Sequence, residues 1–149
     1  MRLHVDVAAE GVRAPVARDR LVALARGVLR AEGVRDAMLS IALVSNREIA
    51  RLNRRHLGRS GPTDVIAFGF APRGPTGGMV GDIYIAPDVA RANAGQYGVG
   101  VRTELARLVV HGTLHVLGHD HPAGDTRMAS PMWRRQERLL ARLWMRRGR

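Results

Sequence analysis

Four of the six histidines of this chain lie within the segment HGTLHVLGHDH, residues 111–121. His111 and His115 are four residues apart, so on a helix both side chains leave the same face, one turn apart, and can share one metal ion. Gly118 can adopt the left-handed conformation that ends a helix, and the returning chain can then supply His121 as a third ligand. Three imidazoles without a fourth protein ligand leave one tetrahedral position open, which is typical of a catalytic zinc site with one ion.

The spacing of these residues matches the metalloprotease pattern H-E-x-x-H-x-x-G-x-x-H, with one departure. Gly112 stands where the pattern has the glutamate that serves as general base. A peptide hydrolase would therefore lack its base, whereas hydrolysis of a phosphodiester by metal-activated water stays open. A histidine-rich helix end that binds no metal is the remaining alternative.

Other polar residues near the histidines have weaker predictions. His119 is expected to point away from the metal, at the surface or among the groups around the ligands. Asp120 is a candidate for orienting a ligating imidazole, with a turn residue as the alternative. Asp82 lies on an otherwise apolar strand, either near the site or on the solvated face, and Thr63 and Asp64 are expected to cap the preceding loop.

Hydrophobic periodicity predicts the elements that must position these residues. Strands are expected at 3–7, 38–44, 65–70 and 80–86, and helices at 16–31, 45–56, 87–95, 102–117 and 131–146. Ser45, followed three residues later by Glu48, has the form of a capping box. The order β α β α β β α α α predicts one α/β domain over residues 1–149, with a mixed sheet of about four strands, about five helices and the three-histidine zinc site at the end of the long helix.

The composition limits the ligands and the partners. Because the chain contains no cysteine, a transition-metal site must be built from histidine or carboxylate. The net charge of +11 comes from 24 arginines without any lysine, and it favours an anionic partner such as RNA. No stretch approaches the roughly 18 apolar residues of a membrane span, and the N-terminus lacks the apolar run of a signal peptide, so we expect a cytoplasmic protein.

Three segments of the chain resemble, in order, those of the YbeY family of bacterial endoribonucleases. HGTLHVLGHDH resembles the family's H-G-x-L-H-L-x-G-[YH]-D-H. LNRRHLGRSGPTDVIAF, residues 52–68, resembles L-N-x-x-[YF]-R-x-x-x-x-P-T-D-V-L-S-F, and GDIYIA, residues 81–86, resembles G-D-I-x-I. The resemblance spans most of residues 40–122.

The resemblance implies an α/β domain that holds one zinc ion through His111, His115 and His121 and cleaves single-stranded RNA. It further implies roles in maturation of the 3′ end of 16S ribosomal RNA and in ribosome quality control. The expected partners are ribosomal RNA and the small ribosomal subunit, without DNA. Two alternatives stay open: a zinc-dependent peptide hydrolase, and a ribosome-associated binding factor whose zinc is structural.

Two departures from the family pattern bear on the activity. Leu57 occupies the place of an arginine implicated in activity, and Ala67 occupies the place of a serine. Arg55 and Arg59 lie two residues to either side of Leu57, and both are expected to bind RNA. We expect Arg59, which can reach the same phosphate, and Asp120 to act in catalysis.

The C-terminal segment is strongly basic. Residues 131–149 hold seven arginines and one acidic residue, Glu137. The apolar residues of this segment have helical spacing, so the helix is expected to pack one face and to present arginines on the other. We expect Arg134, Arg135 and Arg138 to contact RNA phosphates, with a merely solvated helix face as the alternative.

Overall fold

The helices and strands follow the predicted order in a computed structural model that describes residues 2–70, 78–119 and 130–145. The strands are β1 (Arg2–Glu10), β2 (Asp36–Val44), β3 (Val65–Phe70) and β4 (Met79–Ile85). The helices are α1 (Arg18–Ala31), α2 (Asn46–Leu57), α3 (Pro87–Tyr97), α4 (Val101–Val116) and α5 (Pro131–Leu140), and a π-helical segment, Ala141–Met145, follows α5. Among the described helices, none is both long and apolar enough to span a bilayer.

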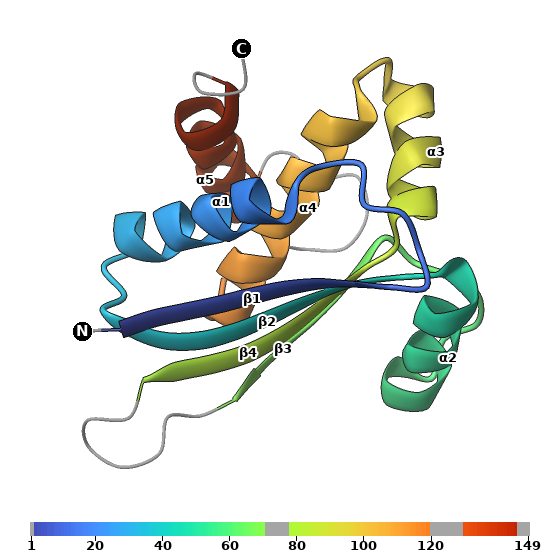
Figure 1. The fold of residues 1–149 in the computed structure, drawn as a ribbon, viewed down its shortest axis with the longest axis horizontal. Coiled ribbons are helices and arrows are strands. Elements are labelled where there is room, and N and C mark those ends of the chain that lie inside the picture. The colour runs from blue at the N-terminus through green and yellow to red at the C-terminus, as the bar shows by residue number, and fades with distance from the viewer. Residues whose placement is uncertain (1, 71–77, 120–129, 146–149) are drawn as a thin grey trace.

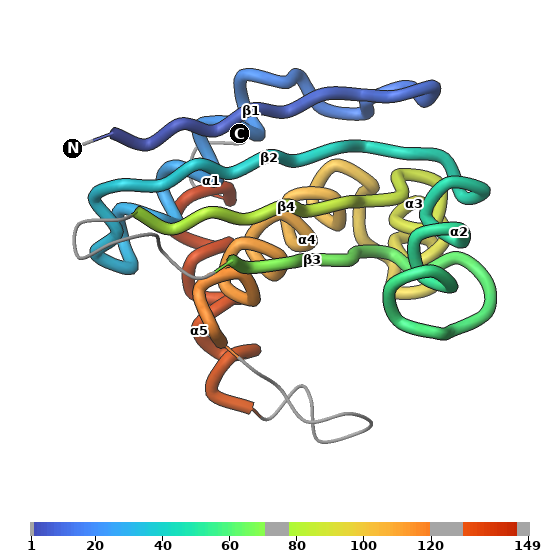
Figure 2. The backbone as a smooth tube through the Cα atoms, turned by 90° about the horizontal axis from the view of Figure 1, so that it is seen from below, coloured from blue at the N-terminus to red at the C-terminus, as the bar shows by residue number. Residues whose placement is uncertain are grey.

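The four strands form one mixed sheet in the order β1-β2-β4-β3, which Figure 2 shows side by side. β1 and β4 are both parallel to β2, and β3 is antiparallel to β4. The prediction of an α/β fold with a mixed four-stranded sheet is confirmed. Because the central strands are parallel, helices must connect them and cover the sheet, which brings α4 over β3 and β4.

Most element boundaries lie within about two residues of the prediction, and the clearest differences are at β1 and at the end of α5. β1 pairs with β2 at every position from Arg2 to Glu10, so ladder hydrogen bonds extend it beyond the alternating stretch 3–7. The last helix changes from α-helical to π-helical geometry at Ala141. Trp144 in this π-helical segment is buried, and the guanidinium carbon of Arg20 on α1 lies 4.2 Å from the centre of its ring.

The sheet has two unequal faces. Figure 1 shows α1, α4 and α5 over one face and α2 on the opposite side. The main core lies beneath the first group of helices and includes Leu39, Ile41, Leu43, Ile83, Ile85, Leu105 and Leu114. A smaller cluster lies beneath α2 and includes Ala42, Val44, Ile49, Leu52 and Ile66. Ile83 faces the main core, so the adjacent Asp82 points to the opposite face of the sheet. Of the two positions expected for Asp82, this one corresponds to the solvated face.

Glycines allow the C-terminal half of α4 to approach the sheet closely. Gly69 and Gly81 are paired residues of β3 and β4, and Val116 lies over both. A Cβ atom at Gly69 would lie 2.7 Å from the carbonyl oxygen of Val116, and one at Gly112 would lie 2.8 Å from Cγ2 of Ile83. These contacts fix the rotation of α4 about its axis, and therefore the direction in which its other face points.

The N-terminus of α2 confirms half of the predicted capping box. The hydroxyl of Ser45 accepts a hydrogen bond from the backbone N–H of Glu48 at 3.1 Å. The Glu48 carboxylate does not return to Ser45, because it pairs with Arg51 at 2.7 Å.

Replacing Ser45 with alanine is expected to lower the free energy of unfolding by about 1 kcal/mol, because one N–H of the first turn loses its acceptor. Urea denaturation followed by circular dichroism would measure the change. Ser60→Ala in the exposed loop serves as the control and should shift the value by less than about 0.5 kcal/mol. Equal stabilities of the two variants would contradict the capping role.

Candidate functional site

His111 and His115 leave the same face of α4, as their spacing predicted. Their ring centroids lie 6.5 Å apart and the ring planes differ by 8°. His115 is exposed and His111 is half-buried. Within residues 2–70, 78–119 and 130–145, no group of three histidine, cysteine or acidic side chains is placed to hold a metal ion. His121 and Asp120 lie outside these ranges, so α4 supplies two of the three predicted ligands.

A buried amide from α5 contacts the first of these histidines. Oε1 of Gln136 lies 2.8 Å from Nδ1 of His111, and only 1% of Gln136 is exposed. Metal-bound histidines commonly use their second ring nitrogen in a hydrogen bond of this kind. The donor chemistry therefore fits a zinc ion: two imidazoles lie one turn apart, and a neighbouring residue holds one of them.

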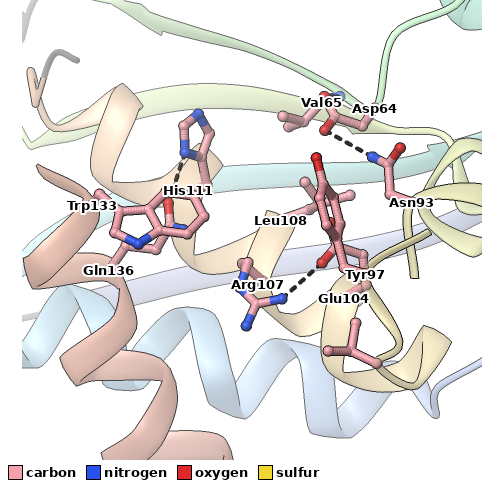
Figure 3. Close-up of a pocket in the computed structure, with 11 residues that line it drawn as sticks. Asp64, Val65, Asn93, Tyr97, Glu104, Arg107, Leu108, His111, Trp133 and Gln136 are labelled. Carbon is pink, nitrogen blue, oxygen red and sulfur yellow. Dashed lines mark hydrogen bonds and ion pairs between the residues drawn. The ribbon is translucent and has the colours of Figure 1, made fainter. Parts of the chain in front are cut away.

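A cavity of about 250 Å³ opens beside His111. Figure 3 shows its side chains converging from the start of β3, from α3, from α4 and from α5. The lining residues are Asp64, Val65, Asn93, Tyr97, Val99, Glu104, Arg107, Leu108, His111, Trp133 and Gln136. The cavity thus combines aromatic and aliphatic walls with two carboxyl groups and one guanidinium, next to a candidate metal ligand.

Glu104 places a carboxyl at the wall of this cavity, with 7% of its side chain exposed. Burial raises the pKa of Glu104 above its ordinary value, and the hydrogen bond from Arg107 at 2.8 Å only partly opposes this. For Arg107, burial lowers the pKa, but hydrogen bonds to Glu137 and Glu104 outweigh that effect and raise it. The cavity therefore contains a fixed positive charge beside a carboxyl with increased proton affinity, an arrangement that suits proton exchange.

Asp64 has two roles in the structure. Its carboxylate accepts a hydrogen bond from the backbone N–H of Val65 at 2.8 Å, so it caps the first residue of β3, whereas the expected cap was of the preceding loop. Its second oxygen accepts a hydrogen bond from Asn93 at 3.4 Å, and both side chains line the cavity. Asp64 therefore belongs to the surroundings of the candidate site as well.

His119 points away from the paired histidines, as expected. Its Nε2 lies 2.6 Å from Glu32 at the end of α1, and the same carboxylate accepts a hydrogen bond from Arg135 at 2.8 Å. Burial opposes ionisation of Glu32, but these two hydrogen bonds outweigh it and hold the pKa of Glu32 below its ordinary value. His119, which follows Gly118 with its φ of 98°, is thereby tied to α1 and, through Glu32, to α5.

The predicted RNA-binding arginines lie in two places. Arg55 on α2 and Arg59 in the following loop are exposed, and neither is among the described residues that line the cavity. On α5, Arg134 and Arg138 are exposed. Arg135 is half-buried, and its guanidinium binds Glu32 and the carbonyl oxygen of Ala31.

The sequence reasoning missed Gln136, Glu104 and Arg107. One signal for the first was available: Gln136 lies on the apolar stripe of α5, where an amide must find a hydrogen-bond partner to be buried. Glu104 gave a similar signal, since it shares a helical stripe with Leu108 and His111. Neither signal identifies the partner: that of Gln136 is His111 on another helix, and that of Glu104 is Arg107, one turn further along α4.

These features define an α/β protein with a polar cavity beside two histidines that share one helix face, an arrangement that marks a candidate active site. Residues 8–144 match the family model described as endoribonuclease YbeY. The chain is 40% identical to the endoribonuclease YbeY of Frankia alni, with 93% of this chain and 82% of the relative covered. It is 41% identical to that of Moorella thermoacetica, with 89% and 92% covered, and 36% identical to that of Bacillus licheniformis, with 95% and 96% covered.

A solved structure agrees with these relatives. The chain is similar to the solution structure of TM1509 from Thermotoga maritima, with a TM-score of 0.63, 27% identity, and 95% of this chain and 90% of that chain covered. This chain belongs to the YbeY family of endoribonucleases. The resemblance found in the three sequence segments is confirmed over nearly the whole chain.

Proposed function

We propose that this chain is a zinc-dependent endoribonuclease that cleaves single-stranded RNA. The observation that carries the proposal is the pair of histidines on one face of α4, with His111 bound by the buried Gln136 amide at the edge of a polar cavity. In the proposal, His111, His115 and His121 hold one zinc ion. Membership of an endoribonuclease family supports RNA as the substrate.

Zinc bound by these imidazoles would supply Lewis-acid activation of the phosphodiester and of the attacking oxygen, which belongs either to water or to a 2′-hydroxyl of the RNA. The exposed His115 leaves the metal side of α4 open to a polymer. Glu104, whose pKa burial raises, can hold a proton at the cavity wall. Arg107 keeps its charge there, which favours an approaching phosphate.

The arginines would hold the RNA backbone. We assign phosphate contacts to Arg55 and Arg59 beside α2 and to Arg134 and Arg138 on α5, because all four are exposed. Arg59 and Asp120 are proposed to act in catalysis. Contacts of this kind make binding depend on salt concentration, since each one releases condensed counterions.

We further propose that the substrate is ribosomal RNA. The enzyme would act in the cytoplasm, in maturation of the 3′ end of 16S ribosomal RNA and in ribosome quality control, with the small ribosomal subunit as partner. The net charge of +11 supports a large polyanionic partner.

The packing of Gly112 disfavours a peptide hydrolase. In the metalloprotease pattern this position holds the general base. Here it lies against Ile83 of the sheet, where even a Cβ atom would be only 2.8 Å from a side-chain carbon. A base at this position would therefore point into the core.

The experiment compares substrates and metal states. Zinc-loaded protein is expected to cleave single-stranded RNA and to leave a duplex of the same sequence and casein intact. Removal of the metal with a chelator should lower RNA cleavage by at least about 100-fold, and added zinc should restore it. Gel analysis of end-labelled RNA would measure the rates. Casein cleavage would favour the peptide hydrolase, and tight RNA binding without cleavage would favour the binding factor; either result would overturn the proposal.

A further inference from the structure

Gln136 is a buried polar residue on an otherwise apolar helix face. It projects from α5 beside Met132, Leu139 and Leu140, all of which belong to the main core. Burying an amide without hydrogen bonds is strongly unfavourable, because the group gives up its hydrogen bonds to water. A leucine at this position would avoid that cost, so the amide requires another explanation.

The two hydrogen bonds of the amide fix its orientation. Nε2 of Gln136 donates to Oε2 of Glu137 at 3.0 Å. An ionised carboxylate can only accept hydrogen bonds, so the NH₂ group must face Glu137 and the carbonyl oxygen must face His111. Because a carbonyl oxygen can only accept, Nδ1 of His111, 2.8 Å away, must carry the proton.

The proton on Nδ1 determines the chemistry of the other ring nitrogen. In a neutral imidazole only one nitrogen is protonated, so Nε2 of His111 carries the lone pair that a metal requires. The hydrogen bond also restricts rotation of the ring about the Cβ–Cγ bond. The same contact therefore selects the tautomer and limits the direction in which Nε2 points.

A further ion pair holds Glu137 in place. Arg107 on α4 donates to both Glu137 oxygens, at 3.0 and 3.1 Å, through its forked guanidinium. It also donates to Glu104 at 2.8 Å. The contacts thus run from Arg107 on α4 to Glu137 and Gln136 on α5, and back to His111 on α4. Figure 3 labels His111, Gln136 and Arg107 and marks the bond between the first two.

We propose that Gln136 is a positioning residue for metal binding, which holds His111 as the Nδ1–H tautomer so that Nε2 serves as the ligand. This inference rests on the proposed function, because it takes His111 as a zinc ligand. It adds a residue outside the three histidines to the metal site, together with the Arg107–Glu137 pair that orients its amide. Substitution of groups that orient a ligating histidine typically weakens metal binding by about 10- to 100-fold.

The test is a zinc titration of the full chain in competition with a chromophoric chelator. Gln136→Leu keeps the size and burial of the side chain but removes the acceptor, and it should weaken zinc binding about 10- to 100-fold. Gln136→Glu keeps an acceptor oxygen and should bind zinc at least about tenfold more tightly than Gln136→Leu does. Gln96→Leu on the exposed face of α3 is the matched control and should bind zinc as the unmodified protein does.

A second measurement uses the unmodified protein, so it does not depend on whether a variant folds. Long-range ¹H–¹⁵N NMR spectra of the metal-free, unmodified protein, recorded at about pH 8 where an ordinary imidazole is neutral, report which ring nitrogen of His111 is protonated. We expect Nδ1–H. A predominant Nε2–H tautomer, or zinc affinity of folded Gln136→Leu within about twofold of the unmodified protein, would overturn the inference.

The outcomes separate this inference from the proposed function. If the protein binds zinc, shows the Nδ1–H tautomer and loses affinity in Gln136→Leu but cleaves no RNA, the proposed function fails and the inference stands. If it cleaves RNA with zinc while Gln136→Leu binds zinc normally, the inference alone fails.

Discussion

Replacing His115 with alanine is expected to remove the bound zinc and to lower the rate of RNA cleavage by at least about 1000-fold. Without His115 the proposed site would keep two of its three nitrogen donors. A rate lowered about 1000-fold corresponds to a loss of about 4 kcal/mol of transition-state stabilisation. His115 is exposed on α4, so the free energy of unfolding of the metal-free protein should change by less than about 0.5 kcal/mol. Zinc content by atomic emission and cleavage of end-labelled RNA would be measured on the same preparations.

Two further variants complete this experiment. His4→Ala, on the exposed edge of β1, is the matched control and should keep both zinc and activity. His111→Ala should lose both, and it should also be less stable by about 1 to 3 kcal/mol because the buried Gln136 carbonyl loses its donor. A His115→Ala protein that retains zinc and cleaves RNA at the normal rate would show that the metal centre lies elsewhere.

Replacing Gly112 with glutamate is expected to destabilise the protein rather than to create a peptidase. The change restores the metalloprotease pattern in the sequence, but a Cβ atom there would lie 2.8 Å from Cγ2 of Ile83, which is fully buried. Overpacking of this kind costs about 1 to 3 kcal/mol, and a carboxylate forced against the core adds several more. A total above about 4 kcal/mol is a large part of the stability of an ordinary domain, which is about 5 to 15 kcal/mol.

Gly95 supplies the matched control for this substitution. It also lies within a helix, α3, but a Cβ atom there would meet no atom within 4 Å. Gly95→Glu should therefore be neutral or stabilising by up to about 1 kcal/mol, because glycine is a poor helix former. Urea denaturation and a casein assay would compare the two. Normal stability of Gly112→Glu, or casein cleavage by it, would refute the packing argument.

Local patterns predicted much of the fold. The alternation in β1, the cap at Ser45 and the apolar stripe of α4 each depend on residues close in sequence, and all three appear in the structure. The spacing of His111 and His115 belongs to the same class, because the geometry of a single helix determines which face they share.

Long-range contacts could not be predicted in the same way. Gln136 lies 25 residues from His111, and Arg107 lies 30 residues from Glu137. Periodicity indicates which face of each helix is buried, but it does not say which residues of two helices meet. The close approach of Val116 to Gly69 and Gly81 is of the same kind, since it depends on the register of β3 against β4.

The hydrogen bond between His111 and Gln136 joins two helices that a ribosome makes at different times. A chain synthesised from its N-terminus presents α4 before α5 exists, so His111 emerges before the amide that orients it. The same order applies to Arg107 and its partner Glu137. A nascent chain that stops before Pro131 therefore contains the paired histidines but lacks the groups that orient the first of them. Translation of α5 supplies these orienting groups, so an unfinished copy would carry the two histidines before the first of them is held in place.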